Sequence, residues 1–325
     1  MQQIRRQFLH ALAGAAALLA VPRAVCAHAY PVRPVRLIVG AAAGSAPDIL
    51  ARLMGQWLSE RLGQPFVIEN RPGGGSNIGT EAVVKSPADG YTLLLVAPAS
   101  AINATLYDKL GFEFIRDITP VAMMTREPLV MLVNPSVPAK TVPEFIAYAK
   151  ANPGKINMAS PGTGTISHIA GELFDMMTGV SMVHVPYHGG APALTDLIAG
   201  RVQVMFIPLL GSTAYIRAGT LRALAVTHAA RWQALPDIPT VAEFVPKYEA
   251  SAWFGVGAPK GTPAEIVERL NQDINAGLAD PAIKAKLTEL GTSAVAGTPG
   301  DFSSLIVAET EKWGKVIRAA NIKPE

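Results

Sequence analysis

The sequence predicts an α/β protein of two lobes, each a mostly parallel sheet flanked by helices, with two strands that cross between the lobes. Three observations support this prediction. Short apolar strands alternate with helical patterns along most of the chain, two longer extended stretches interrupt the alternation, and several strand-to-helix junctions are rich in small residues. A length of 325 residues fits about two domains. The periodicity leaves one alternative open, a single large doubly wound domain.

The first part of the chain follows the order strand, helix, strand, helix, strand. Between residues 50 and 62 the apolar side chains recur at helical spacing, which places them on one face of a helix that covers a sheet. The predicted strands are 35–39, 66–69 and 91–96, the predicted helices are 50–62 and 77–85, and a Gly-rich turn lies at 71–76.

The segment 121–133 is long and extended, as expected of a strand that crosses between lobes, and the alternation then restarts. It predicts helices at 142–151, 166–178, 192–199 and 213–218, and strands at 155–159, 182–185, 202–206 and 223–227. A second extended stretch at 248–258 leads into helices at 263–279, 281–290 and 302–320. The expected lobes are therefore 30–127 together with 254–325, and 128–253.

Residues 1–29 have the pattern of an export signal rather than of a folded element. Arg5 and Arg6 precede an apolar run that is too short to span a bilayer, and small residues offer cleavage after Ala27 or Ala29. The paired arginines also fit the twin-arginine route, so both this route and the general secretory route stay open. The alternative is a buried N-terminal helix.

Charge and cysteine content exclude several classes of protein. The chain has 28 basic and 25 acidic residues, and residues 1–29 hold three of the basic ones and no acidic one, so the remainder is balanced. A nucleic-acid-binding protein would be expected to show a clear basic excess. Cys26 is the only cysteine, so the exported chain is expected to have no disulfide and no cysteine-based metal site.

Three strand-to-helix junctions share one design, at residues 40–48, 160–165 and 186–192. Small side chains leave the backbone N–H groups accessible, and the N-terminus of a helix carries a partial positive charge, so each junction is a potential anion site. Ligands of open α/β sheets bind beyond the carboxyl ends of the strands. If the first junction faces the other two across a cleft, a small carboxylate can be held from both lobes.

Single residues in these junctions each have a structural alternative. Asp48 lies in a first helical turn and can cap the helix or contact a ligand, and His168 can donate to an anion or be exposed to solvent. Tyr187 can close over a ligand or be a half-buried loop aromatic. His184 and His188 are four residues apart, but the proline between them excludes the helical geometry of a metal-binding pair, so no metal site is expected.

The sequence contains no recognisable catalytic motif. It has no Gly-x-Ser-x-Gly elbow, no phosphate-binding P-loop and no His-Glu-x-x-His pair, and the Gly-rich stretch 73–79 lacks the dinucleotide spacing. We therefore expect no enzyme and no cofactor, with an exported hydrolase on the same scaffold as the minor alternative.

Five longer motifs follow one another along the chain: ENRPGGGSNIG at 69–79, DGYTL at 89–93, GTGTISHIAGEL at 162–173, HVPY at 184–187 and PDIPT at 236–240. Together they resemble the substrate-binding proteins of tripartite tricarboxylate transporters, also called the Bug family. The resemblance covers nearly the whole chain after residue 30.

This resemblance implies a periplasmic-binding-protein fold of the Venus-flytrap type, which closes over a small di-, tri- or aromatic carboxylate. It also implies a monomer in the periplasm that docks transiently on a two-subunit membrane permease and delivers the ligand to it. A sensor that reports to a membrane signalling protein is the alternative, because both functions depend on the same closure. Carried over by position, the site residues are Ala41, Gly44, Ser45, Asp48, Ala99, Ser100, Gly162, Thr163, Gly164, Thr165, His168, Tyr187, Gly189, Gly190 and Ala191.

Two positions depart from the pattern of the family. Ala41 stands where an aromatic residue commonly covers the ligand, and Ile207 stands where many members have an aspartate. The missing acid removes a partner for a ligand ammonium, and the missing aromatic ring leaves more room. The ligand is therefore expected to lack an amino group and to be bulkier than a C4 acid.

Overall fold

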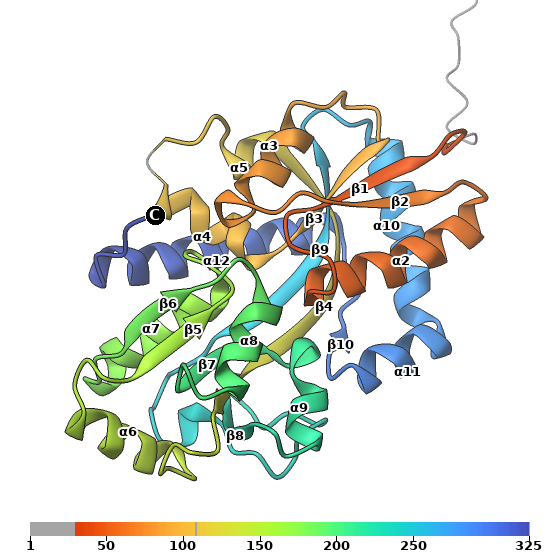
Figure 1. Ribbon diagram of the computed structural model, residues 1–325. Coiled ribbons are helices and arrows are strands. Elements are labelled where there is room, and N and C mark those ends of the chain that lie inside the picture. The colour runs from red at the N-terminus through yellow and green to blue at the C-terminus, as the bar shows by residue number, and fades with distance from the viewer. Residues whose placement is uncertain (1–29, 108, 325) are drawn as a thin grey trace, which may run out of the picture. The chain divides into compact units, whose positions relative to one another are not determined.

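A computed structural model describes residues 30–107 and 109–324 of the chain (Figure 1). The predicted export signal at 1–29 lies outside the described residues. Every element described below lies within Pro31–Glu325. In the part of the chain that is described, no helix is long and apolar enough to cross a membrane.

The first group of strands has the order β2-β1-β3-β9-β4, and β10 also pairs with β4. The first three strands run parallel, whereas β9 is antiparallel to both of its neighbours. The strands are β1 (Val35–Val39), β2 (Phe66–Asn70), β3 (Thr92–Val96), β4 (Ile118–Val133), β9 (Ser251–Pro259) and β10 (Ser293–Ala294). The accompanying helices are α2 (Ala46–Leu62), α3 (Asn77–Val84), α4 (Pro98–Leu106), α5 (Phe114–Asp117), α10 (Ala264–Ala279), α11 (Pro281–Glu289) and α12 (Pro299–Ala319).

The second group of strands continues from β4 in the order β4-β7-β5-β6, and β8 also pairs with β4. Here β5 is parallel to β6 and β7, whereas β7 and β8 are antiparallel to β4. The strands are β5 (Asn157–Ser160), β6 (Val183–Pro186), β7 (Val204–Pro208) and β8 (Arg222–Val226). The helices are α6 (Val142–Ala151), α7 (Ile166–Thr178), α8 (Gly190–Ile198) and α9 (Thr213–Arg217), with short 3-10 turns η2 (Gly74–Ser76), η3 (Leu209–Gly211) and η4 (Val241–Glu243).

Strand β4 belongs to both groups and changes partner along its length. Residues 118–128 pair with β9, and residues 129–133 pair with β7 and β8. Thr227 joins the crossing segments at this point, because its hydroxyl accepts from Leu129 N at 2.8 Å and lies 2.6 Å from Ala250 O. Both predicted crossing stretches are therefore found, as β4 and as the chain that leads into β9.

Each group of strands has an apolar cluster of its own. One cluster includes Leu94, Trp253 and Phe302, and the other includes Leu132 and Met205, all nearly inaccessible to solvent. Burial of such side chains is the main favourable contribution to folding. The molecule thus has two lobes that share β4.

The sequence prediction is corrected in three places. Both sheets are mixed rather than mostly parallel, because the crossing strands pair antiparallel with their neighbours. Helices α4 and α5 lie between the predicted strand 91–96 and the predicted extended segment 121–133, where no element was predicted. Helix α8 begins at Gly190, two residues before the proline that was expected to open it.

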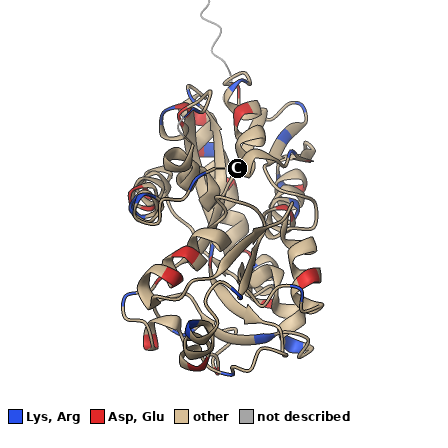
Figure 2. Ribbon diagram, turned by 60° about the vertical axis from the view of Figure 1, so that its left-hand side comes forward, with Lys and Arg blue, Asp and Glu red and all other residues tan. Residues whose placement is uncertain are grey.

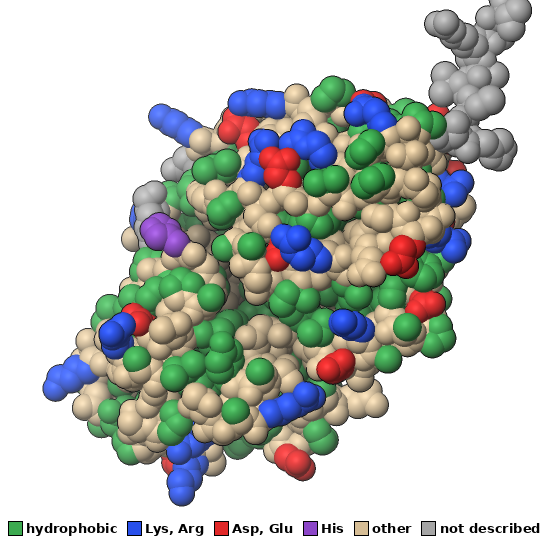
Figure 3. Space-filling model, turned by 45° about the vertical axis from the view of Figure 1, so that its right-hand side comes forward, with side chains coloured by type: hydrophobic (Ala, Val, Ile, Leu, Met, Phe, Trp, Pro, Cys, Tyr) green, Lys and Arg blue, Asp and Glu red, His purple; other side chains and the backbone are tan. Residues whose placement is uncertain are grey.

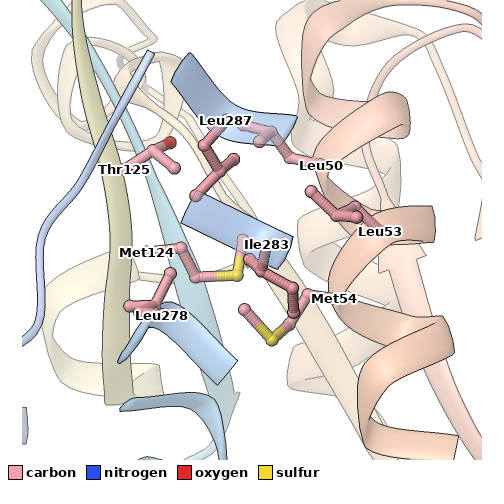
Figure 4. A pocket seen from close by; sticks show the side chains of 8 residues that line it. All are labelled: Leu50, Leu53, Met54, Met124, Thr125, Leu278, Ile283 and Leu287. Carbon is pink, nitrogen blue, oxygen red and sulfur yellow. The ribbon is translucent and has the colours of Figure 1, made fainter. Parts of the chain in front are cut away.

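A small gap lies between α2, β4, α10 and α11 (Figure 4). Its volume is about 10 Å³, and its walls are leucine, isoleucine and methionine side chains with Thr125 as the polar exception. A space of this size holds at most one water molecule. It is a packing defect of the first lobe and not a ligand pocket.

Candidate ligand-binding site

The strand directions bring the predicted ligand loops to the junction of the lobes. Because β4 runs from the first lobe into the second and β7 runs antiparallel to it, the carboxyl ends of β5, β6 and β7 point toward the first lobe. By the same pairing the carboxyl ends of β1 and β3 point toward the second lobe. The surface is hollowed where the lobes meet, and hydrophobic side chains gather around the hollow (Figure 3).

Contacts between the loops confirm that they approach one another. A Cβ atom placed on Gly189 would lie 3.6 Å from the Cβ of Ala42, which belongs to the loop before α2. Figure 1 likewise shows the start of α2 opposite α8. The first junction therefore faces the third across the cleft, as the sequence suggested.

The loop before α2 is held in shape by Asp48 and Asn70. The Asp48 carboxylate accepts from the backbone N–H of Gly44 at 2.8 Å and from the Arg52 guanidinium at 3.0 Å, and Asn70 donates to Ala41 O at 3.0 Å. Burial alone would raise the pKa of Asp48, but the hydrogen bonds from Arg52, Gly44 and Asn70 together hold it below its ordinary value. The Asp48 side chain is only 3% exposed. In the structure Asp48 thus holds the loop in shape, as in the capping alternative.

Replacing Asp48 with alanine is expected to destabilise the protein by about 1–3 kcal/mol, because the Gly44 N–H and the Arg52 side chain lose a charged partner. Asp48→Asn keeps one acceptor oxygen and should lose less. Chemical denaturation of the two variants measures the difference. Equal stability of Asp48→Ala and the wild type would contradict this role.

The second junction forms a tight loop before α7. Thr165 caps the helix as predicted, since its side chain accepts from His168 N, and its hydroxyl also donates to Gly162 O at 2.7 Å. Ser160 is fully buried, and its hydroxyl accepts from Gly162 N at 3.1 Å. The loop Gly162–Thr165 is therefore rigid, and the first N–H groups of α7 lie at its end.

His168 does not occupy the position expected of an anion donor. Its side chain is 5% exposed and stacks on His184 with ring centroids 3.6 Å apart. Its Nδ1 accepts from Gly164 N at 3.3 Å, and its Nε2 lies 3.4 Å from Glu172. Burial and the neighbouring His168 lower the pKa of His184 to about 3, so that this ring stays neutral. His168 supports the loop from behind, and the solvent-exposed alternative is wrong.

The third junction places Tyr187 against its own lobe. The phenol donates to Asp196 at 2.8 Å, and Asp196 also pairs with Arg201. Burial and the Asp196 carboxylate raise the pKa of Tyr187. The ring is half-buried in the second-lobe cluster, as in the structural alternative. Gly189, which follows it, approaches Ala42 of the first lobe, whereas Gly190 lies next to Ile207 and Pro161 of the second lobe.

The segment Ala97–Ser100 is the start of α4 rather than a loop. Ala97 is the N-cap, and Ser100 N donates to Ala97 O at 2.9 Å. The side chains of Ala99 and Ser100 are buried, at 7% and 8% exposure. This helix therefore contributes its N-terminal turn to the region between the lobes.

A larger cavity, with a volume of about 360 Å³, lies between residues of the second lobe and the C-terminal segment after α12, which belongs to the first lobe. Two predicted site residues line it, Thr163 and His168, but no residue of the loops at 41–48 or 97–100 does. Its remaining walls are Glu172, His184, Pro186, Ala320, Ile322 and Lys323. Its walls therefore do not include the ligand loops of the first lobe.

Acidic and basic residues are scattered along the helices and strands of both lobes (Figure 2). Among the residues that the structure describes, no group of three or more His, Cys, Asp or Glu side chains is arranged to hold a metal ion.

Two lobes that share a crossing strand, with helix N-termini and small-residue loops at their junction, define a solute-binding protein. A family model described as "Tripartite tricarboxylate transporter family receptor" matches residues 50–322. The chain is 37% identical over 302 residues to protein BugT of Bordetella pertussis, which covers 92% of this chain and 93% of BugT.

Solved structures agree with this classification. A protein of R. palustris solved with adipate superimposes with a TM-score of 0.88 at 42% identity, covering 91% of this chain and 100% of that one. MatC from Rhodopseudomonas palustris, solved with malate, superimposes with a TM-score of 0.84 at 31% identity, covering 89% and 100%. The chain belongs to the tripartite tricarboxylate transporter receptor family, the Bug proteins included, and has the two-lobed periplasmic-binding-protein fold of that family.

Sequence reasoning missed several residues that shape the site. Asn70, Arg52 and His184 hold the ligand loops by contacts with residues distant in the sequence. Asn70 lies in the motif at 69–79 and His184 in the motif at 184–187, and these were the available signals, but the motifs do not show which loops the two side chains contact.

Proposed function

We propose that this protein is a periplasmic receptor that captures a small carboxylate between its lobes and delivers it to a membrane permease with a large and a small subunit. The observation that carries the proposal is the approach of Ala42 to Gly189, which places loops of both lobes around one space. The first turns of α2, α4, α7 and α8 adjoin these loops and offer backbone N–H groups to an anion. The receptors solved with adipate and with malate support a carboxylate as the ligand.

The proposed ligand is a dicarboxylate without an amino group and longer than a C4 acid. Ile207, at the end of β7, lies next to Gly190 and Gly211, since Cβ atoms on these glycines would be 3.7 and 3.8 Å from its Cδ1. An apolar side chain at this place offers no partner to an ammonium group, and burying an ammonium without a partner is costly. It offers a favourable contact to a methylene chain instead.

Capture works by population shift in this proposal. A ligand held from both lobes has a higher affinity for the closed state and therefore stabilises it. We propose the lobe limits 30–127 with 254–325, and 128–253, which the change of partner in β4 after residue 128 supports. Export to the periplasm would remove residues 1–29, and N-terminal sequencing of the periplasmic form tests the cleavage at Ala27 or Ala29.

Thermal unfolding of the protein from Tyr30 onward, after unfolding and refolding to remove any co-purified ligand, tests the proposal. The panel contains a chain-length series (succinate, glutarate, adipate and pimelate) and two matched amino acids, glutamate and 2-aminoadipate. A ligand at 100 times its dissociation constant adds about 2.7 kcal/mol to the stability, which is a shift of a few degrees.

We expect upward shifts for glutarate, adipate or pimelate that exceed those for succinate and for the matched amino acids. A larger shift with 2-aminoadipate than with adipate would contradict the assignment at Ile207. No shift with any carboxylate, including aromatic and tricarboxylic acids, would contradict the receptor function as stated.

A further inference from the structure

The Gly-rich turn around η2 belongs to the motif at 69–79, yet it is not one of the proposed ligand loops. Asn103 of α4 anchors this turn, because its amide donates to Gly75 O at 2.7 Å and to Asn77 Oδ1 at 2.9 Å. Asn103 is only 2% exposed. The turn is thereby fixed to the side of α4 that faces the second lobe.

Gly75 brings the turn into contact with the other lobe. Its φ of 62° lies in the left-handed region, and a Cβ atom there would be 3.4 Å from Thr163 O and 3.4 Å from the Tyr107 hydroxyl. Thr163 belongs to the ligand loop before α7, on the second lobe. The backbones of the two lobes thus meet at this point.

Gly164, the next residue of that loop, makes the matching contact with α4. Its φ is 77°, and a Cβ atom there would lie 2.5 Å from Leu106 Cδ2 and 2.9 Å from Asn103 Oδ1. Leu106 is 3% exposed. A methyl group of the first lobe therefore rests directly on the backbone of a ligand loop in the second lobe.

The polar part of this contact is incomplete. Asn103 Oδ1 is buried and has no hydrogen-bond partner among the described residues. The Gly164 N–H cannot satisfy it, because this group donates to His168. Separation of the lobes would hydrate the oxygen and expose Leu106, so the contact combines a favourable apolar burial with an unfavourable polar one.

We propose that Leu106 and Asn103 are positioning residues for ligand binding, which form with Gly75 and Gly164 an interlobe latch that sets the closed-state population without touching the ligand. The inference rests on the proposed receptor function and extends it. Leu106 supplies the contact that favours closure, and Asn103 holds the Gly75 turn in register with the loop. The missing hydrogen bond at Asn103 keeps the latch reversible.

The experiment uses the protein from Tyr30 onward, in which Cys26 is absent, with spin labels at Glu60→Cys in α2 and Lys150→Cys in α6. Both side chains are exposed, one on each lobe. The distance distribution is measured by double electron–electron resonance without ligand and with adipate. The affinity for adipate and the association and dissociation rates of adipate are measured on the same proteins. The wild type is compared with three variants, Leu106→Ala, Leu106→Met and Asn103→Ala.

The latch predicts that Leu106→Ala and Asn103→Ala lengthen the interlobe distance without ligand and weaken adipate about tenfold, mainly through faster dissociation. Leu106→Met keeps the volume and should bind like the wild type. Leu58→Ala in α2 is the matched control, because it truncates a leucine that is 1% exposed away from the latch and should lower stability without changing distance or affinity.

Unchanged distances and affinity in Leu106→Ala and Asn103→Ala would overturn the latch. If Leu106→Ala does not fold, Asn103→Ala makes the same test. If the wild type binds no carboxylate, the proposed function fails, and the ligand-free distances still decide the latch. The latch is supported if the wild type without ligand has a population with a short interlobe distance and both variants lack this population. The latch is overturned if the wild type itself lacks this population.

Discussion

Replacing Ala42 with tryptophan is expected to abolish carboxylate binding while leaving the fold intact. Ala42 approaches Gly189 across the cleft, and the indole would occupy the region between these two proposed ligand loops. The backbone of the loop should keep its shape, because Ala42 contributes its carbonyl oxygen to the hydrogen bond from Ser45. We expect a loss of affinity of at least about 100-fold, which corresponds to about 2.7 kcal/mol.

Two further variants control for bulk and for position. Ala282→Trp adds the same side chain at an exposed site on α11 and should bind normally, and Ala42→Ser makes a small change at the same position. Binding is measured by calorimetry with the acid that the thermal screen selects, and unfolding temperatures without ligand verify the fold. An affinity for Ala42→Trp within threefold of the wild type would place the ligand outside the cleft.

Glu127→Gln is expected to stabilise the protein increasingly as the pH rises. Glu127 lies on β4 at the crossing between the lobes and is completely buried. Its carboxyl accepts from Leu210 N at 2.8 Å, and its second oxygen has no hydrogen-bond partner among the described residues. Burial raises the pKa of Glu127 to about 8, an increase that the hydrogen bond from Leu210 reduces only in part.

The sign of the effect follows from proton binding. Between pH 4.5, the ordinary pKa, and about pH 8 the folded protein keeps a proton on Glu127 that the unfolded chain has released. Stability from this group is therefore fully present below pH 4.5 and is lost as the pH rises toward 8. Each pKa unit corresponds to about 1.4 kcal/mol, so the loss amounts to at most about 5 kcal/mol. Glutamine does not titrate and avoids this loss.

Denaturation midpoints of the wild type and Glu127→Gln, measured in urea between about pH 5 and pH 8, test the prediction. The difference between the two proteins should grow with pH, whereas Glu311→Gln, at an exposed position of α12, should follow the wild type. Asp175 acts in the same direction, because burial and the nearby Glu172 raise its pKa to about 7, so some pH dependence remains in the variant. A difference that stays constant with pH would show that Glu127 does not titrate in this range.

Most elements of the fold were predictable from the sequence. Val35–Val39, Val142–Ala151 and Ile166–Thr178 have the predicted bounds, and most other elements differ from prediction by a few residues at their ends. Helix and strand periodicities depend on residues close in the chain, and the apolar faces here are regular. Helix α4 was missed because its alanines, serine and asparagine give no clear apolar face, and its burial depends on packing against α12.

The candidate site was predictable as a set of loops and not as a set of side chains. Small residues and prolines at the ends of strands mark the junctions, and the parallel order of the strands places these junctions at one edge of each sheet. The roles of Asp48, His168 and Tyr187 were left open, and in each case the structure shows contacts within the protein. These contacts involve packing and partners that no local pattern reveals.

Residues close together in the chain were enough to predict the alternation of strands and helices, the two crossing stretches, the small-residue junctions and the resemblance to the receptor family. The folded structure was needed to show that His168 is stacked on His184, that Glu127 is buried with no charged partner among the described residues, and that Gly75 and Gly164 meet between the lobes. Burial and close approach arise when segments far apart in the chain pack together. The pKa and the hydrogen bonds of a polar side chain therefore depend on residues that are distant from it in the sequence.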